Sequence, residues 1–155
     1  MFIIVFFCSC NKNRSSFNTF ELSYDSGWAQ SFSIKIDSVG NCYFRDLIIS
    51  NFYCNKAQVP DSIMNICDEL AKEIKNNKHK SFKSSGCADC SSLSILITAK
   101  DKKYTLTQMD FTDKKIYKYV DVLQKFINKT KFQKIDSIVI FKSEPLEQIK
   151  WITPE

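Results

Sequence analysis

Residues 32–44, FSIKIDSVGNCYF, carry the pattern that decides the fold. Apolar and polar side chains alternate over residues 32–36, which is typical of a β-strand with one buried face. Residues 37–41 contain Asp, Ser, Gly and Asn, which are residue types that form turns. Apolar residues resume at Cys42, so we predict a strand, a tight turn and an antiparallel return strand.

The segments on either side continue this arrangement. Residues 20–24 alternate in the same way and predict an earlier strand. On the other side, residues 47–49 either continue the strand that begins at Cys42 or form a short neighbour. Residues 60–62, Pro-Asp-Ser, begin a helix, because proline is tolerated in the first turn and Asp or Ser can cap free amides. Apolar residues then recur at helical spacing, and we expect the helix to end near residues 76–77.

The second half of the chain repeats the alternation of strands and helices. We predict a strand over residues 93–97, a hairpin loop at 100–103, a return strand over 104–109, a helix over 112–127 capped by Thr112, and a last strand over 135–141. The element order is then βββ-α-ββ-α-β. Since hairpins predominate, the sequence predicts an α+β fold. It has a mostly antiparallel sheet of about five or six strands and two helices packed on one face.

Size and charge limit the function. A chain of 155 residues predicts a single folded unit, which we place at residues 19–155. The formal net charge is +5, but Arg14 and Arg45 are the only arginines among 22 basic residues. Arginine is the preferred side chain for bidentate recognition of phosphates and bases, so we predict no nucleic-acid partner.

The N-terminus begins with an apolar run, residues 2–7, followed by a polar stretch at residues 11–16. A membrane-spanning helix needs roughly 20 apolar residues, so this run is too short to span. It is either a buried strand or the apolar centre of a secretory signal. The polar stretch has no strand period, which favours the signal.

The sequence Phe7-Cys8-Ser9-Cys10 resembles the lipobox of bacterial lipoprotein signal peptides, where a small residue precedes an invariant cysteine. The resemblance implies that residues 1–9 are a signal peptide and that Cys10 carries a lipid. Residues 10–18 would then be the lipidated cysteine and a polar tether. Phe7 replaces the usual leucine and no basic n-region is present, so the signal is truncated or starts upstream. The resemblance implies a bacterial cell-envelope location, periplasmic or surface-exposed, with the membrane as a partner through the anchor.

Residues 37–41 and 89–93 also resemble features of a group of small uncharacterised bacterial lipoproteins, which brings no known activity.

The spacing Cys87-Ala88-Asp89-Cys90 has three interpretations: a redox pair, half of a zinc site, or a structural disulfide. Loop and strand follow it where a redox motif needs a helix, and no second CxxC provides zinc ligands. An exported chain favours disulfides. Cys42 with Cys54, and Cys87 with Cys90, is one pairing, which leaves Cys67 as a free thiol. The sequence does not fix the pairing.

Catalytic residue patterns are mostly absent. His79, the single histidine, lies in a polar basic loop where we expect it to be solvated. The aspartates at 25, 37, 46, 89 and 110 fall at turns or strand ends, and turn chemistry accounts for them. With three glycines in the chain, no phosphate-binding glycine loop is present. We therefore predict no enzyme, no cofactor and no metal site.

The most basic stretch contains Lys72, Lys75, Lys78, Lys80 and Lys83. These side chains are either a solvated helix end or a surface that faces anionic lipid headgroups. Taken together, the sequence predicts a membrane-tethered envelope lipoprotein with a non-catalytic binding or interaction module, for which a protein is the expected partner. Two alternatives stay open: a periplasmic immunity protein that binds a toxin, and a thiol redox or metal site at Cys87 and Cys90.

Overall fold

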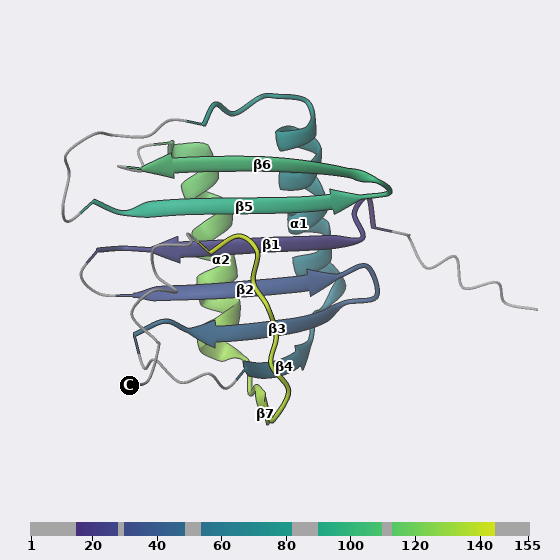
Figure 1. Ribbon diagram of the computed structural model, residues 1–155, viewed down its shortest axis with the longest axis vertical. Helices are drawn as coiled ribbons and strands as arrows, with labels where there is room; N and C mark the ends of the chain where they lie inside the picture. Colours follow the sequence, from purple (N-terminus) through teal and green to yellow (C-terminus); the bar gives the residue numbers. More distant parts are fainter. Residues whose placement is uncertain (1–14, 28–29, 49–53, 82–89, 110–112, 145–155) are drawn as a thin grey trace, which may run out of the picture.

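The computed structural model describes residues 15–27, 30–48, 54–81, 90–109 and 113–144. In chain order the elements are β1 (Thr19–Asp25), β2 (Ser31–Asp37), β3 (Asn41–Asp46), β4 (Cys54–Gln58), α1 (Asp61–Lys75), β5 (Ser92–Ala99), β6 (Lys102–Met109), α2 (Lys114–Lys129) and β7 (Gln133–Ile135). These strands form one seven-stranded sheet in the order β6-β5-β1-β2-β3-β4-β7, and every neighbouring pair is antiparallel (Figure 1).

The α+β class and the antiparallel sheet are as predicted, and both helices cover one face (Figure 1). β1 lies in the middle of the sheet because α1 returns the chain to its free edge, where β5 pairs with it. The register places Leu22 opposite Ile34 on one side and Ile95 on the other, so apolar side chains form continuous rows toward the helices.

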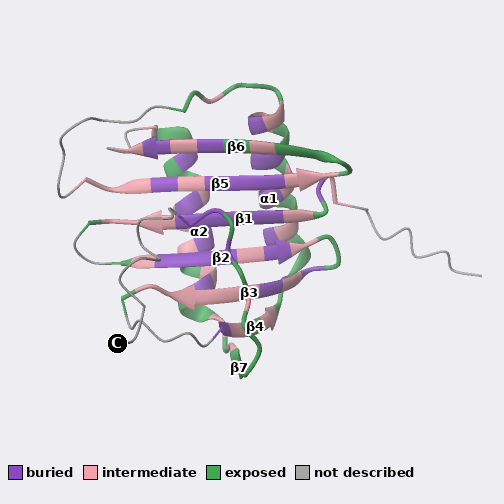
Figure 2. Ribbon diagram, viewed as in Figure 1, coloured by how far each residue is buried: buried purple, intermediate pink, exposed green. Residues whose placement is uncertain are grey.

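The hydrophobic core lies between these rows and the two helices. Figure 2 shows the buried residues concentrated in the central strands and on the inner sides of the helices. Helix α1 contributes Ile63, Cys67, Leu70, Ala71 and Ile74, and helix α2 contributes Ile116, Val120, Leu123 and Ile127. These are the positions that the helical spacing predicts. Burial of each large side chain stabilises the fold by about 1.5–3 kcal/mol.

The opposite face of the sheet is crossed by the chain that follows β7. Figure 1 shows this segment, in yellow-green, running over the sheet from the β7 edge toward β1. We call residues 138–144 the C-terminal strap. The amides of Lys142 and Ser143 on the strap donate to Glu21 of β1 at 2.6 and 3.2 Å. In the part of the chain that the structure describes, the helices cover one face of the sheet and the strap crosses the other.

Two strand predictions were wrong. The predicted order lacked β4, and the predicted count of five or six strands was too low. The sequence of β4, CNKAQ, shows no clear alternation of apolar and polar residues. The strand is short, and two of its five side chains are exposed. The structure also ends β7 at Ile135, although we predicted a strand over 135–141. Ile138 and Ile140 are 85% and 67% exposed on the strap, so this apolar run forms no ladder.

The ends of the helices agree with the prediction more closely. Asn76 follows α1 as its C-cap, and Asn77 has a positive φ of 54°, which ends the helix. Asp113 is the N-cap of α2 and accepts from the amides of Lys115 and Ile116. The cap thus lies one residue later than Thr112, the residue that we predicted, which is itself outside the described ranges.

Candidate functional site

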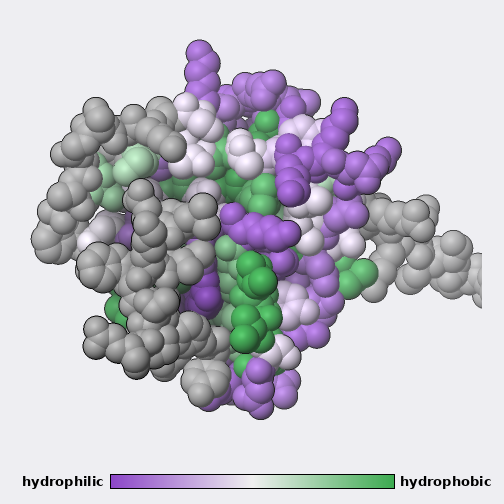
Figure 3. All heavy atoms as spheres, viewed as in Figure 1, coloured by the Kyte–Doolittle hydropathy of each residue, from purple (hydrophilic) through white to green (hydrophobic). Residues whose placement is uncertain are grey.

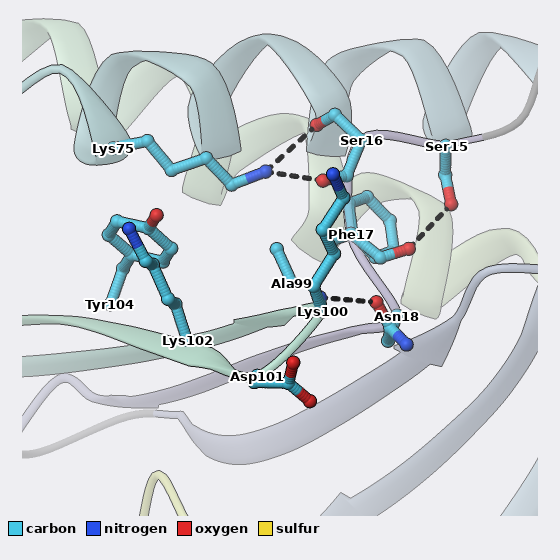
Figure 4. Close-up of a pocket in the computed structure, with 10 residues that line it drawn as sticks. All are labelled: Ser15, Ser16, Phe17, Asn18, Lys75, Ala99, Lys100, Asp101, Lys102 and Tyr104. Carbon is cyan, nitrogen blue, oxygen red and sulfur yellow. Dashed lines mark hydrogen bonds between the residues drawn. The ribbon is translucent and has the colours of Figure 1, made fainter.

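A hollow with a volume of about 590 Å³ lies where the end of α1, the β5–β6 turn and the segment before β1 meet. Its lining comprises Ser15, Ser16, Phe17, Asn18, Lys75, Ala99, Lys100, Asp101, Lys102 and Tyr104 (Figure 4). We call this feature the N-terminal hollow. Its walls come from three parts of the chain, so its composition depends on the fold.

The segment before β1 is fixed to the domain. The Ser16 amide donates to the Asp68 carboxylate of α1 at 2.7 Å. The Asn18 amide donates to the Thr98 carbonyl at 2.7 Å, and Phe17 is 2% exposed. Residues 15–18, which we assigned to the polar tether, are thus packed against the domain, and the folded unit extends at least to Ser15.

Lys75 reaches from the last turn of α1 across the hollow toward Ser16 (Figure 4). Its ammonium donates to the Ser16 carbonyl and lies 3.4 Å from the Ser16 hydroxyl. It also lies 6.0 Å from the centre of the Tyr104 ring, within range of a cation–π attraction. Burial lowers the pKa of Lys75, Asp68 opposes this shift and Lys72 adds to it. The amine is therefore partly removed from water with neutral groups as its direct partners.

Two further lysines enter the hollow from the β5–β6 turn. Lys100 and Lys102 belong to its lining, and the amide of Lys100 donates to the Asn18 side-chain oxygen at 2.9 Å. In the described chain, none of Lys75, Lys100 and Lys102 has a carboxylate within 4.0 Å. Asp101 is the single acidic residue of the lining, and Figure 4 shows its carboxylate directed away from Lys75. The hollow therefore has an excess of positive charge.

The predicted basic cluster is divided in the structure. Of its members, Lys75 alone lines the hollow, and Lys83 lies outside the described residues. Lys100 and Lys102 replace the others, and sequence reasoning missed them because they were assigned to a hairpin loop. Their lysine-rich turn, KDKK, was the available signal. This turn could be assigned to the hollow only from the fold, which places it beside Lys75.

His79 forms a second charged cluster, and the prediction that it is solvated was wrong. Its side chain is 3% exposed and lies between two carboxylates. Nε2 is 2.9 Å from Glu73 of α1, and Nδ1 is 3.0 Å from Asp113, the cap of α2. A neutral imidazole donates to one of these groups, and an imidazolium donates to both. Neither ring nitrogen is directed at open solvent, so the ring connects two helices and has no free nitrogen for catalysis.

Asp113 shows the electrostatic effect of this cluster. Burial alone would raise its pKa. The hydrogen bond with His79 and the amides of Lys115 and Ile116 outweigh burial, so the pKa of Asp113 lies below its usual value. The folded state therefore favours the ionised carboxylate.

A third polar cluster lies under the C-terminal strap. Glu21 is 2% exposed and forms an ion pair with Lys35 at 3.0 Å in addition to its bonds to the strap amides. Arg45 of β3 pairs with Glu144, and burial lowers the pKa of Arg45. Ser23 is hydrogen-bonded to Ser33 and Ser143 at 2.9 and 2.8 Å. These contacts hold the strap on the sheet.

Cys42 and Cys54 are free thiols and are not brought together. The β3–β4 register places Ala57, not Cys54, opposite Cys42. Cys54 lies three steps along β4 from Ala57, or about 10 Å, and an odd number of steps places the side chains of Cys42 and Cys54 on opposite faces of the sheet. Disulfides need Cα atoms roughly 4.4–6.8 Å apart, so this pair cannot close without rearrangement.

Cys67 is a free thiol in the core, as we expected, and burial raises the pKa of both Cys67 and Cys42. Cys90 is disulfide-bonded. The three free thiols account for the other cysteines in the described ranges, so its partner lies beyond them. Cys10 and Cys87 also lie there, and the proposed lipid site and CxxC motif therefore stay predictions.

Three of the aspartates form turns. Asp25 accepts from the Gly27 amide, and Asp37 accepts from the amides of Val39 and Asn41. Asp46 accepts from the Ile48 amide. Asp89 and Asp110 are not among the described residues. Where the structure describes them, these carboxylates hold loops in shape.

Within the described ranges, no group of three or more His, Cys, Asp and Glu side chains is arranged to hold a metal ion, and neither helix is long and apolar enough to cross a membrane. The chain matches no protein-family model, no curated protein and no solved structure. Function must therefore be inferred from the clusters themselves.

Proposed function

We propose that this chain is a non-catalytic binding module of the bacterial cell envelope, held at a membrane by a lipid on Cys10. The observation that carries the proposal is the attachment of Ser15–Asn18 to the domain by the Ser16–Asp68 bond and by burial of Phe17. Four residues lie between Cys10 and Ser15, and the five steps along the chain reach at most about 17 Å when extended. The domain would then be held beside the bilayer surface.

The absence of a catalytic role is supported by how the chemically capable side chains are used. His79 connects two helices, Glu21 binds the strap, and three turn aspartates accept from backbone amides. Cys42 and Cys67 have raised pKa values, which disfavours the reactive thiolate. These groups stabilise the fold, and the proposal assigns them no reaction.

Labelling with an alkyne analogue of palmitate, in bacteria that express the full chain, tests the anchor. We expect label on the wild-type chain and none on Cys10→Ser, because that substitution removes the thiol to be acylated. Cys8→Ser is the matched control, and it should keep the label. Unlabelled wild-type chain, or label that survives Cys10→Ser, would contradict the proposal.

A protein partner is favoured by the exposed isoleucines of the strap. An apolar patch is visible on this face in Figure 3, and Ile138 and Ile140 are two of the most exposed large apolar residues described. An immunity protein that binds a toxin in the periplasm is one form of this function. Ile138→Ser with Ile140→Ser should reduce recovery of a partner from native membranes, whereas Val39→Ser, at another exposed apolar site, should not. Equal recovery with both variants would exclude the strap as the contact.

A further inference from the structure

The N-terminal hollow has a charge that the fold does not neutralise. Lys75, Lys100 and Lys102 lie around it, and the described chain places no carboxylate within 4.0 Å of any of them. Exposed lysines such as Lys72 and Lys78 also have no carboxylate within 4.0 Å in the described chain, but water surrounds them. Lys75 differs because it is partly buried, with the carbonyl and hydroxyl of Ser16 as its direct contacts. An anion that enters the hollow would therefore give this ammonium a charged partner that the described chain does not provide.

We propose that the N-terminal hollow binds the phosphate group of an anionic membrane lipid, with Lys75, Lys100 and Lys102 as the groups that receive its charge. This inference rests on the proposed membrane attachment and adds a ligand class to it. A lysine ammonium is a compact point charge that binds phosphate oxygens through charge-assisted hydrogen bonds. Three of them around one hollow suit a phosphodiester better than a neutral ligand.

The shape and lining of the hollow fit a small polar headgroup. Its volume of about 590 Å³ exceeds the need of one phosphate and leaves space for a glycerol unit. Asn18 uses its side-chain oxygen to accept from Lys100, so its NH₂ group has no protein partner in the described chain. Figure 4 shows the Tyr104 hydroxyl on the side of the ring that faces Lys75. An amide and a hydroxyl are the donors that a glycerol headgroup needs.

The partial burial of Lys75 makes a charged ligand more favourable. Its pKa is lowered by burial, which reflects the loss of water around an ammonium held mainly by a carbonyl and a hydroxyl. A phosphate oxygen in the hollow would replace that lost hydration with an opposite charge. Because Lys75 contacts Ser16, the ligand site is also joined directly to the segment that leads to Cys10.

The test uses the full chain in a neutral detergent and follows backbone amide shifts of Ser16, Asn18, Lys100 and Lys102 by NMR. The probes are glycerophosphoglycerol, which has the phosphodiester of an anionic lipid without acyl chains, the zwitterionic glycerophosphocholine, and inorganic phosphate. We expect saturable shifts with glycerophosphoglycerol and at least about tenfold weaker binding of glycerophosphocholine. No shift at these amides, or equal affinity for both diesters, would overturn the proposal.

Charge-removing variants locate the site. Lys75→Met should raise the Kd for glycerophosphoglycerol about tenfold, the loss expected for one charge-assisted hydrogen bond. Lys125→Met is the matched control, since Lys125 lies on the exposed side of α2 and should change the Kd less than about twofold. An equal effect of both variants would show general charge attraction only, and would overturn the assigned site.

Experiments with lipid vesicles test whether the bound phosphate belongs to a membrane lipid. Full chain in vesicles of phosphatidylglycerol should show the same amide shifts, and full chain in phosphatidylcholine vesicles should not. Binding of inorganic phosphate alone, without a response to phosphatidylglycerol, would contradict a lipid source. Palmitate labelling at Cys10 is independent of this experiment, because the soluble diester reports on the hollow whether or not the chain is acylated.

Discussion

Glu73 and Lys75 lie two residues apart on α1, but they belong to clusters of opposite character. Glu73 faces His79, which Asp113 contacts from the other side, and the three side chains satisfy one another. Lys75 faces the N-terminal hollow, where Lys100 and Lys102 add charge of the same sign. The first cluster connects two helices, and the second is open to a ligand.

The difference teaches that the position of a charge along the chain does not reveal its use. We expected His79 to be solvated in a basic loop, and Lys75 to lie either at a solvated helix end or on a surface that faces anionic lipid headgroups. The fold provides two carboxylates for His79 and none within 4.0 Å for Lys75 in the described chain. What separates a structural charge from an available one is the partner that tertiary structure provides.

The largest loss of stability should come from breaking the cluster of His79, Glu73 and Asp113. His79→Ala removes hydrogen bonds to two ionisable carboxylates and leaves them facing each other. We expect the free energy of unfolding to fall by about 2–3 kcal/mol. Urea unfolding measures this change, with Lys75→Met as the comparison at a cost of about 1 kcal/mol or less. Similar losses in the two variants would remove the distinction between the clusters.

The polar cluster under the strap should also contribute to stability, because its charged groups have their partners within the fold. Glu21→Ala leaves the Lys142 and Ser143 amides without their acceptor and Lys35 without its ion pair. The expected loss is about 1–2 kcal/mol, because the strap can partly detach and recover hydrogen bonds with water. Hydrogen exchange should become faster at Lys142 and Ser143 and remain unchanged in α2. Unchanged exchange at the strap would mean that Glu21 does not hold it.

A ligand in the N-terminal hollow should stabilise the folded chain through Lys75, and this stabilisation should not depend on the His79 cluster. At ten times its Kd, glycerophosphoglycerol should raise the free energy of unfolding by about 1.4 kcal/mol, provided that it binds only the folded chain. His79→Ala should retain this increment on its lower baseline. At the same ligand concentration, Lys75→Met should lose most of it. Loss of the increment in His79→Ala would show that the two clusters are coupled.

The smallest effect concerns the charge of Asp113. Asp113→Asn keeps a residue that caps helices well but removes the negative charge near His79, and we expect a loss of about 1 kcal/mol at neutral pH. Because the folded-state pKa of Asp113 is lowered, its contribution is fully present above the unfolded pKa of about 3.9. It disappears as the pH falls through the lower folded-state value.

Acid titration of unfolding compares the two chains. The difference in unfolding free energy between wild type and Asp113→Asn should stay level from pH 5.5 to about 4.5, then shrink in more acidic solution. A difference that grows as the pH falls below 4 would contradict the assigned direction.

Much of the fold could be predicted from local patterns. The alternation in β1 and β2 and the helical spacing in α1 and α2 identify the core because each buries one continuous face. The strand β4 could not be found, since its five residues, CNKAQ, include only two apolar side chains and show no clear alternation. Residues 138–141 of the strap were predicted as part of a strand because their apolar run resembles one, although the structure anchors the strap mainly by polar contacts to the other face of the sheet.

The candidate site was less predictable than the fold. Lys75 was identified as part of a basic stretch, but Lys100 and Lys102 join it through tertiary structure alone. The environment of His79 depends on Asp113, 34 residues further along the chain. Contacts at such separations are determined by how the helices pack, and a single sequence contains no local pattern that reports them.

The most direct test of the account is the orientation of the domain on a membrane. Nitroxide labels at Lys103→Cys and Ser92→Cys would mark opposite ends of the β5–β6 hairpin, about 20 Å apart by strand geometry. The full chain would be reconstituted in bilayers whose headgroups chelate nickel, and spin relaxation would be measured for each label. The account predicts strong enhancement at residue 103, beside the hollow, and weak enhancement at residue 92. Equal enhancement at the two positions, or a stronger effect at residue 92, would contradict it.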